Sequence, residues 1–103
     1  MRIAIVDDLP AEAQRLQSMI REEFHNTQTD IHRLDVFPSA EALLAGWTPN
    51  TYDLVLLDIY MDGITGVEAA HILRRSDEHV RLVFCTTSNE FASESYAVGA
   101  SYY

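Results

Sequence analysis

Apolar residues along the chain fall into two alternating patterns, short unbroken runs and longer stretches with helical spacing. The runs are rich in β-branched residues, which favour strands. They predict five strands, over residues 2–6, 31–37, 53–58, 80–85 and 100–103. The helical spacing predicts four helices, from Pro10 through Phe24, over 40–46, from Val67 through Leu73 and over 90–98. This alternation indicates an open α/β sheet, whose ligands bind beyond the carboxyl ends of the strands.

The predicted strands differ in how deeply they should be buried. Residues 53–58 and 80–85 are apolar at consecutive positions, which is typical of strands covered on both faces in the middle of a parallel sheet. The run 31–37 contains more polar residues and suits an edge strand. We therefore expect the two apolar runs to lie inside the sheet.

Several single residues have expected structural roles. Trp47 is expected to cover the core, and Phe84 to pack within it. The one cysteine, Cys85, lies within an apolar run and is expected to behave as a small buried hydrophobic residue. The acidic neighbours Asp77 and Glu78 are expected in a solvated loop, because charge clusters usually face water.

Net charge limits the class of partner. Sixteen acidic residues against seven basic residues give a formal net charge of −9, which repels a phosphate backbone and argues against direct DNA binding by this segment. No apolar run approaches the length needed to span a bilayer, and residues 1–4 lead into a strand rather than a signal peptide. We expect one soluble, cytoplasmic domain over residues 1–103.

Oxygen-bearing side chains follow three of the predicted strands. They include Asp7, Asp8, Asp58 and Thr86. In a right-handed doubly wound sheet these strand ends lie on one rim, so the carboxylates can converge on a pocket the size of an ion. Carboxylate oxygens suit Mg²⁺, whereas zinc is disfavoured because all four histidines lie outside these loops. Beside such a cation, Asp58 could attack a phosphorus centre and form an aspartyl phosphate.

The segments "IAIVDD", "LVLLDIYM", "VFCTTS" and "GASYY" resemble the receiver domain of two-component response regulators. The resemblance covers residues 1–103. It implies a flavodoxin-like (CheY-like) doubly wound parallel sheet in the order 2-1-3-4-5. Residues 83–103 are similar, more narrowly, to receivers that precede LytTR-type DNA-binding domains. The resemblance therefore implies a signalling domain that is not a conventional enzyme and that controls transcription through a further C-terminal domain.

The resemblance also implies roles for single residues. Asp58 would accept a phosphoryl group from a sensor histidine kinase, with Mg²⁺ as the cofactor. The implied metal ligands are Asp7, Asp8, Asp58 and the backbone carbonyl of Tyr60. The implied switch residues are the hydroxyl of Thr86 and the aromatic ring of Tyr103. Tyr60 and Ser88 occupy the positions at which receivers vary to tune the lifetime of the phosphoryl group.

Two departures from the family pattern bear on these expectations. Asp62 stands where the family usually has proline, which adds negative charge and removes a rigid turn. The sequence ends at Tyr103, before the usual lysine–proline pair, most of the fifth strand and the fifth helix. We therefore expect an open edge at the fourth strand that favours association, with homodimerisation through that edge or through the surface of strand 4, helix 4 and strand 5.

Two other functions remain open from the sequence. An aspartate-nucleophile phosphohydrolase would also place a carboxylate and glycines as in "DIYMDGITG", but such enzymes carry a second aspartate where Tyr60 stands. A phosphorylation-independent interaction module could keep the fold without the switch. Asp7, Asp8, Asp58 and Thr86 argue against that module, whereas the missing lysine argues for it.

Overall fold

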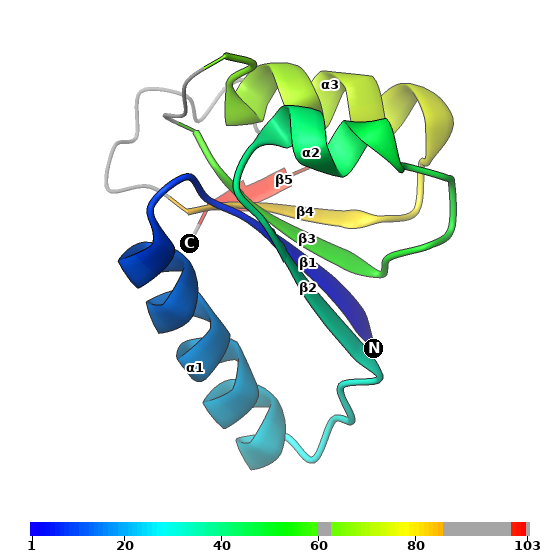
Figure 1. The fold of residues 1–103 in the computed structure, drawn as a ribbon. Helices are drawn as coiled ribbons and strands as arrows, with labels where there is room; N and C mark the ends of the chain where they lie inside the picture. Colours follow the sequence, from blue (N-terminus) through cyan, green and yellow to red (C-terminus); the bar gives the residue numbers. More distant parts are fainter. Residues whose placement is uncertain (60–62, 86–99, 103) are drawn as a thin grey trace.

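The computed structural model describes residues 1–59, 63–85 and 100–102, which form one sheet flanked by helices (Figure 1). The strands are β1 (Arg2–Val6), β2 (Arg33–Phe37), β3 (Leu54–Asp58), β4 (Arg81–Cys85) and β5 (Ala100–Tyr102). The described helices are α1 (Pro10–Asn26), α2 (Ala40–Ala45) and α3 (Gly66–Ser76). The helix expected over 90–98 lies outside the described residues.

The strands lie in the order β2-β1-β3-β4-β5, and every neighbouring pair is parallel. This confirms the predicted sheet and the edge position of β2. The expectation of an open edge at β4 is wrong over Leu82–Phe84, because these residues pair with β5. β2 begins at Arg33 rather than at residue 31, because β1 begins at Arg2 and its first pairing is with Arg33.

Helices cover both faces of the sheet, with α1 on one side and α2 and α3 on the other (Figure 1). β3 explains the consecutive apolar pattern. Its residues Val55 and Leu57 pack on the α2–α3 side, whereas Leu54 and Leu56 pack on the α1 side. Since successive strand residues point to opposite faces, a strand buried on both sides must be apolar throughout.

Sequence features also account for the helix starts. Pro10 occupies the first turn of α1, where a missing N–H costs nothing. Ser39 caps α2 by accepting from the Ala42 N–H, and Thr65 caps α3 by accepting from the Glu68 N–H. Among the described residues, no helix combines the length and apolar character needed to cross a lipid bilayer.

Two of the residues singled out in the sequence pack as expected. Phe84 is fully buried. Trp47 packs against the α2–α3 core, stacks on Tyr52 and donates its indole N–H to the Ser76 hydroxyl. Cys85 is only half-buried, against the α1 side of the sheet.

The exposed edge at β2 carries a small charged cluster. Arg33 pairs with Asp35, and its guanidinium lies 5.2 Å from the ring centroid of Tyr52. The Tyr52 hydroxyl donates to Asp35 Oδ2 at 2.6 Å. The polar groups of this edge therefore satisfy one another on the protein itself.

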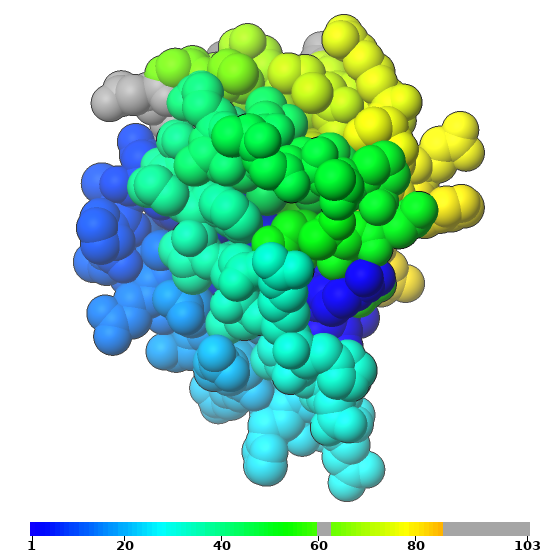
Figure 2. Space-filling model, turned by 45° about the vertical axis from the view of Figure 1, so that its right-hand side comes forward, coloured from blue at the N-terminus to red at the C-terminus, as the bar shows by residue number. Residues whose placement is uncertain are grey.

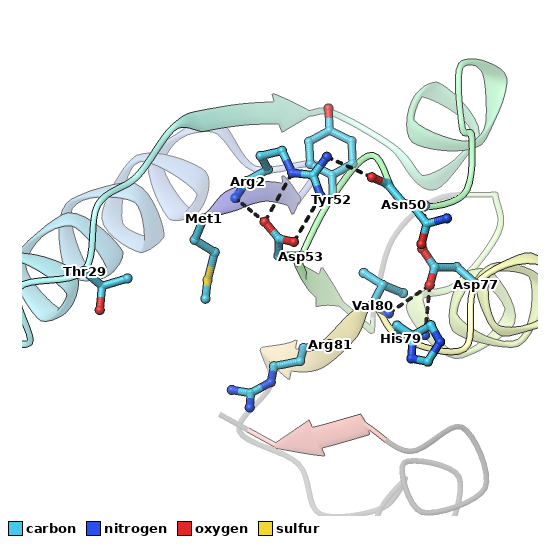
Figure 3. A pocket seen from close by; sticks show the side chains of 10 residues that line it. All are labelled: Met1, Arg2, Thr29, Asn50, Tyr52, Asp53, Asp77, His79, Val80 and Arg81. Carbon is cyan, nitrogen blue, oxygen red and sulfur yellow. Dashed lines mark hydrogen bonds and ion pairs between the residues drawn. The ribbon is translucent and has the colours of Figure 1, made fainter.

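Segments far apart in sequence meet at the amino ends of the strands. Figure 2 shows the blue N-terminal residues between the cyan segment that leads to β2 and the green segment that leads to β3. Arg2 forms an ion pair with Asp53 and donates to the Asn50 carbonyl. A cleft of about 520 Å³ opens beside these residues (Figure 3).

Asp77 connects the loops at this end of the sheet through hydrogen bonds. The expectation that it would be a solvated loop residue is wrong. It is only 4% exposed. Its carboxylate accepts the backbone N–H groups of Asn50 (2.9 Å), His79 (2.9 Å) and Val80 (3.0 Å). Burial alone would raise the pKa of Asp77, but these hydrogen bonds outweigh it and the pKa is lowered.

Replacing Asp77 with alanine should destabilise the fold, because three backbone N–H groups lose their acceptor. We expect a loss of about 2–3 kcal/mol in the free energy of unfolding, measured by urea denaturation. Glu78→Ala is the matched control, because Glu78 is exposed, and it should change stability by less than about 0.5 kcal/mol. Equal effects of the two substitutions would contradict the structural role of Asp77.

The free energy of unfolding should also depend on pH through the carboxylate of Asp77. Because the pKa of Asp77 is lower in the folded state, its contribution is present above the ordinary pKa of about 3.9 and is lost as the pH falls through the folded value. Asp77→Asn keeps one acceptor oxygen but does not ionise. The difference in stability between the native chain and Asp77→Asn should therefore shrink as the pH is lowered below about 4.

Candidate functional site

Asp7 is held rigidly where β1 ends. Its backbone N–H donates to the Phe37 carbonyl at 3.1 Å, which continues the pairing of β1 with β2. Its side-chain Oδ1 accepts the Leu9 N–H at 2.9 Å, so the carboxylate also shapes the turn into α1. The residue is 3% exposed. One carboxylate is thus fixed at the sheet edge by the local backbone.

Asp58 ends β3, in register with Cys85 on β4, and is half-buried. Asp8 is half-buried beside the end of β1. Asp7, Asp8 and Asp58 each offer a carboxylate oxygen, and these atoms all lie within 4.8 Å of one another. The convergence expected from the strand order is therefore present.

Crowded negative charge has an electrostatic consequence. Burial raises the pKa of Asp7, the hydrogen bond from Leu9 opposes that shift, and the charge of Asp8 adds to the rise. Burial and then the charge of Asp58 raise the pKa of the Cys85 thiol to about 12. Cys85 is therefore a neutral thiol beside the cluster, and a cation would relieve the repulsion among the carboxylates.

The cluster has the composition of a magnesium site. All three side chains are carboxylates, which are hard oxygen donors, and the triad includes no histidine or cysteine. Mg²⁺ usually takes only one or two carboxylates and keeps several waters, so the two half-exposed members, Asp8 and Asp58, suit it.

The start of α3 lies against the end of β3. The Gly66 N–H donates to the Ile59 carbonyl at 3.1 Å, which closes the loop onto the strand. A Cβ atom at Gly66 would lie 2.2 Å from the Asp58 carbonyl oxygen, so only glycine fits there. Gly63 adopts a backbone φ of 80°, which residues with a side chain rarely adopt. These glycines allow the helix α3 to start directly beside Asp58.

Four predicted site residues lie outside the described residues, namely Tyr60, Thr86, Ser88 and Tyr103. Asp62 also lies there. Sequence reasoning missed Glu41, whose Oε1 accepts the Ile64 N–H at 2.7 Å in the loop after β3. The two residues are 23 positions apart, and no motif in the sequence links them.

Comparison with known proteins identifies the family. The response regulator receiver domain matches residues 3–103. The chain belongs to the response regulator receiver family. The receiver is 34% identical over 106 residues to the positive alginate biosynthesis regulatory protein of Pseudomonas aeruginosa, and 26% identical over 103 residues to the sensory transduction protein LytR of Staphylococcus epidermidis.

These alignments cover 97% and 100% of the receiver but 39% of each relative. The receiver thus spans about two-fifths of the length of the curated relatives that it matches. Among solved structures, it resembles the response regulator TrrA of Thermotoga maritima in complex with Mg²⁺ and BeF, at a TM-score of 0.78 and 29% identity, covering 98% and 84% of the two chains. TrrA in complex with the histidine kinase ThkA matches at a TM-score of 0.66 and 28% identity, covering 97% and 82%.

The close approach of Gly66 to Asp58 gives a test of the local geometry. Gly66→Ala should destabilise the receiver by about 1–3 kcal/mol or more, because the added Cβ must displace backbone rather than a flexible side chain. Gly46→Ala is the control, since a Cβ at Gly46 meets nothing within 4 Å and its φ is −114°. That control should be neutral or stabilising by up to about 1 kcal/mol.

Thermal or urea unfolding of both variants measures the difference. If Gly66→Ala were as stable as Gly46→Ala, the close approach of Gly66 to the carbonyl of Asp58 would be contradicted.

Proposed function

We propose that this receiver is a phosphorylation switch that accepts a phosphoryl group on Asp58 from a sensor histidine kinase. One observation carries the proposal. The carboxylate oxygens of Asp7, Asp8 and Asp58 lie within 4.8 Å of one another at the carboxyl edge of the sheet. The mutual repulsion of the three carboxylates does not stabilise the fold, whereas a cation-assisted phosphoryl acceptor needs carboxylate oxygens that are close enough to share one cation.

The three carboxylates have two roles in this mechanism, metal binding and nucleophilic attack. Asp7 and Asp8 would hold Mg²⁺, together with Asp58 and the backbone carbonyl of Tyr60. The bound cation would neutralise charge on the phosphoryl oxygens. An Asp58 oxygen forms a bond to phosphorus while the bond from phosphorus to the kinase histidine nitrogen breaks, and the electron pair of that bond returns to the imidazole. The rigid end of β3 aims this oxygen.

The response would follow from the new charge on Asp58. Thr86 would move its hydroxyl toward the phosphoryl group, and Tyr103 would change rotamer with it. Tyr60 and Ser88 would set the lifetime of the modification. A local charge change would in this way bias a two-state surface.

The partners and location are part of the same proposal. The solved complex of TrrA with a histidine kinase supports a kinase as the phosphoryl donor. The name of one longer relative, the transcriptional regulatory protein YvrH of Bacillus subtilis, supports transcriptional output. We propose that a C-terminal LytTR-type DNA-binding domain carries out that output. We place this activity in the cytoplasm, with homodimerisation through strand 4, helix 4 and strand 5 as the means of output.

Phosphorylation can be tested by intact mass. Incubation of the receiver with acetyl phosphate and Mg²⁺ should add the mass of one phosphoryl group, and Asp58→Asn should abolish the addition. Asp30→Asn is a matched control, because Asp30 is an exposed aspartate far along the chain from the cluster. An unmodified native chain, or a modified Asp58→Asn chain, would overturn the assignment of Asp58.

Magnesium binding gives a second test. Mg²⁺ should raise the unfolding temperature of the receiver, since a ligand at about 100 times its Kd adds roughly 2.7 kcal/mol to stability. Asp7→Asn should lose most of this gain, because it removes the negative charge of a buried oxygen ligand. If Mg²⁺ stabilised Asp7→Asn as much as the native chain, the ion would bind elsewhere.

Backbone amide shifts should be used to follow binding in preference to tryptophan fluorescence. Trp47 donates to Ser76 and stacks on Tyr52, which lies just before the start of β3. Asp58 lies at the other end of that strand. The indole therefore reports on folding at the opposite end of the sheet, whereas the amides of Asp58 and Ile59 adjoin the cluster directly.

A further inference from the structure

Glu41 connects the helix α2 to the loop that follows Asp58. It lies in the first turn of α2, and its Oε1 accepts the Ile64 N–H at 2.7 Å. The acceptor is a carboxylate oxygen, which makes the stronger class of hydrogen bond. Helix α2 is itself anchored, because Ala40 and Leu43 are buried in the core. A rigid element thus holds a point in the loop.

The contact between Glu41 and the loop is also close-packed. A Cβ atom at Gly63 would lie 2.7 Å from Glu41 Oε1. The carboxylate therefore lies directly over the backbone of Gly63, and the absence of a side chain there makes its approach to Ile64 possible. The carboxylate of Glu41 therefore contacts two neighbouring residues of the loop, Gly63 and Ile64.

An unbroken series of contacts leads from this carboxylate to the acidic cluster. Ile64 precedes Thr65, which caps α3, and Gly66, whose N–H donates to the Ile59 carbonyl. Gly66 also packs against the carbonyl of Asp58. A shift of Ile64 would therefore be transmitted through two residues to the backbone that aims the Asp58 side chain.

We propose that Glu41 is a positioning residue that fixes the backbone around Asp58 and thereby raises the affinity of the acidic cluster for a divalent cation. This inference rests on the proposed function for its consequence, but its geometry stands on the contacts of Glu41 alone. Glu41 does not belong to the group of carboxylates that converge with Asp58. It acts on the site through the loop.

The test compares three variants by amide exchange and by Mg²⁺ titration of the amide shifts of Asp58 and Ile59. Glu41→Ala should speed exchange of the Ile64 amide and weaken Mg²⁺ binding about threefold, less than the roughly 10–100-fold loss for groups that contact metal ligands directly. Glu41→Gln keeps an acceptor oxygen and should restore most of both properties. Glu22→Ala removes the same charge from an exposed position on α1 and should resemble the native chain.

These variants distinguish the positioning role of Glu41 from a simple effect of its negative charge. If Glu41→Gln were as impaired as Glu41→Ala, or if Glu22→Ala weakened Mg²⁺ binding equally, then charge alone would explain the effect and the positioning role would be overturned. If Glu41→Ala matched the native chain in both measurements, the proposal would also fail.

Failure of the proposed function has a different signature. A native chain whose Asp58 and Ile59 amides do not respond to Mg²⁺ would overturn the magnesium site itself. In that case, altered Asp58 and Ile59 shifts in the ion-free Glu41→Ala chain, restored in Glu41→Gln, would still support Glu41 as the residue that positions this backbone. Unaltered shifts would overturn both.

Discussion

Repulsion among carboxylates at one edge of the sheet is the constraint on which the rest of the site depends. Two unit charges about 4 Å apart repel by roughly 1 kcal/mol in water and by about 4 kcal/mol near a protein surface. The fold imposes this cost on Asp7, Asp8 and Asp58 by ending β1 and β3 at neighbouring positions. The hydrogen bonds of Asp7 with Phe37 and Leu9, and the hydrogen bond from the Gly66 N–H to the Ile59 carbonyl beside Asp58, keep the groups from moving apart.

The amino and carboxyl ends of the strands carry different arrangements of charge. At the amino ends, Asp77 and the ion pair of Arg2 with Asp53 have partners for their charges and join separate loops. At the carboxyl ends, carboxylate oxygens of Asp7, Asp8 and Asp58 lie within 4.8 Å of one another. The contacts at the amino ends stabilise the fold that brings the carboxylates together at the other edge of the sheet.

Local sequence patterns were enough to predict the strands and the meeting of Asp7, Asp8 and Asp58, because both depend on strand period and on strand ends. The strand order was predicted from the resemblance to the receiver family, since periodicity does not reveal it. Local patterns did not predict Asp77 or Glu41. The distant partner of Asp77 is the Asn50 N–H, and the partner of Glu41 is the Ile64 N–H. These backbone groups are 27 and 23 residues away, and a backbone N–H leaves no trace in a sequence. Tertiary hydrogen bonds of this kind require the fold to be known first.

The cluster of Arg33, Asp35 and Tyr52 has a consequence for self-association. An edge strand presents unpaired backbone groups that can recruit another chain into a continuous sheet. At β2, charged side chains stand along that edge and are already satisfied by one another. A second molecule that docked there would have to desolvate or separate these charges. These charges therefore disfavour the addition of another strand beside β2.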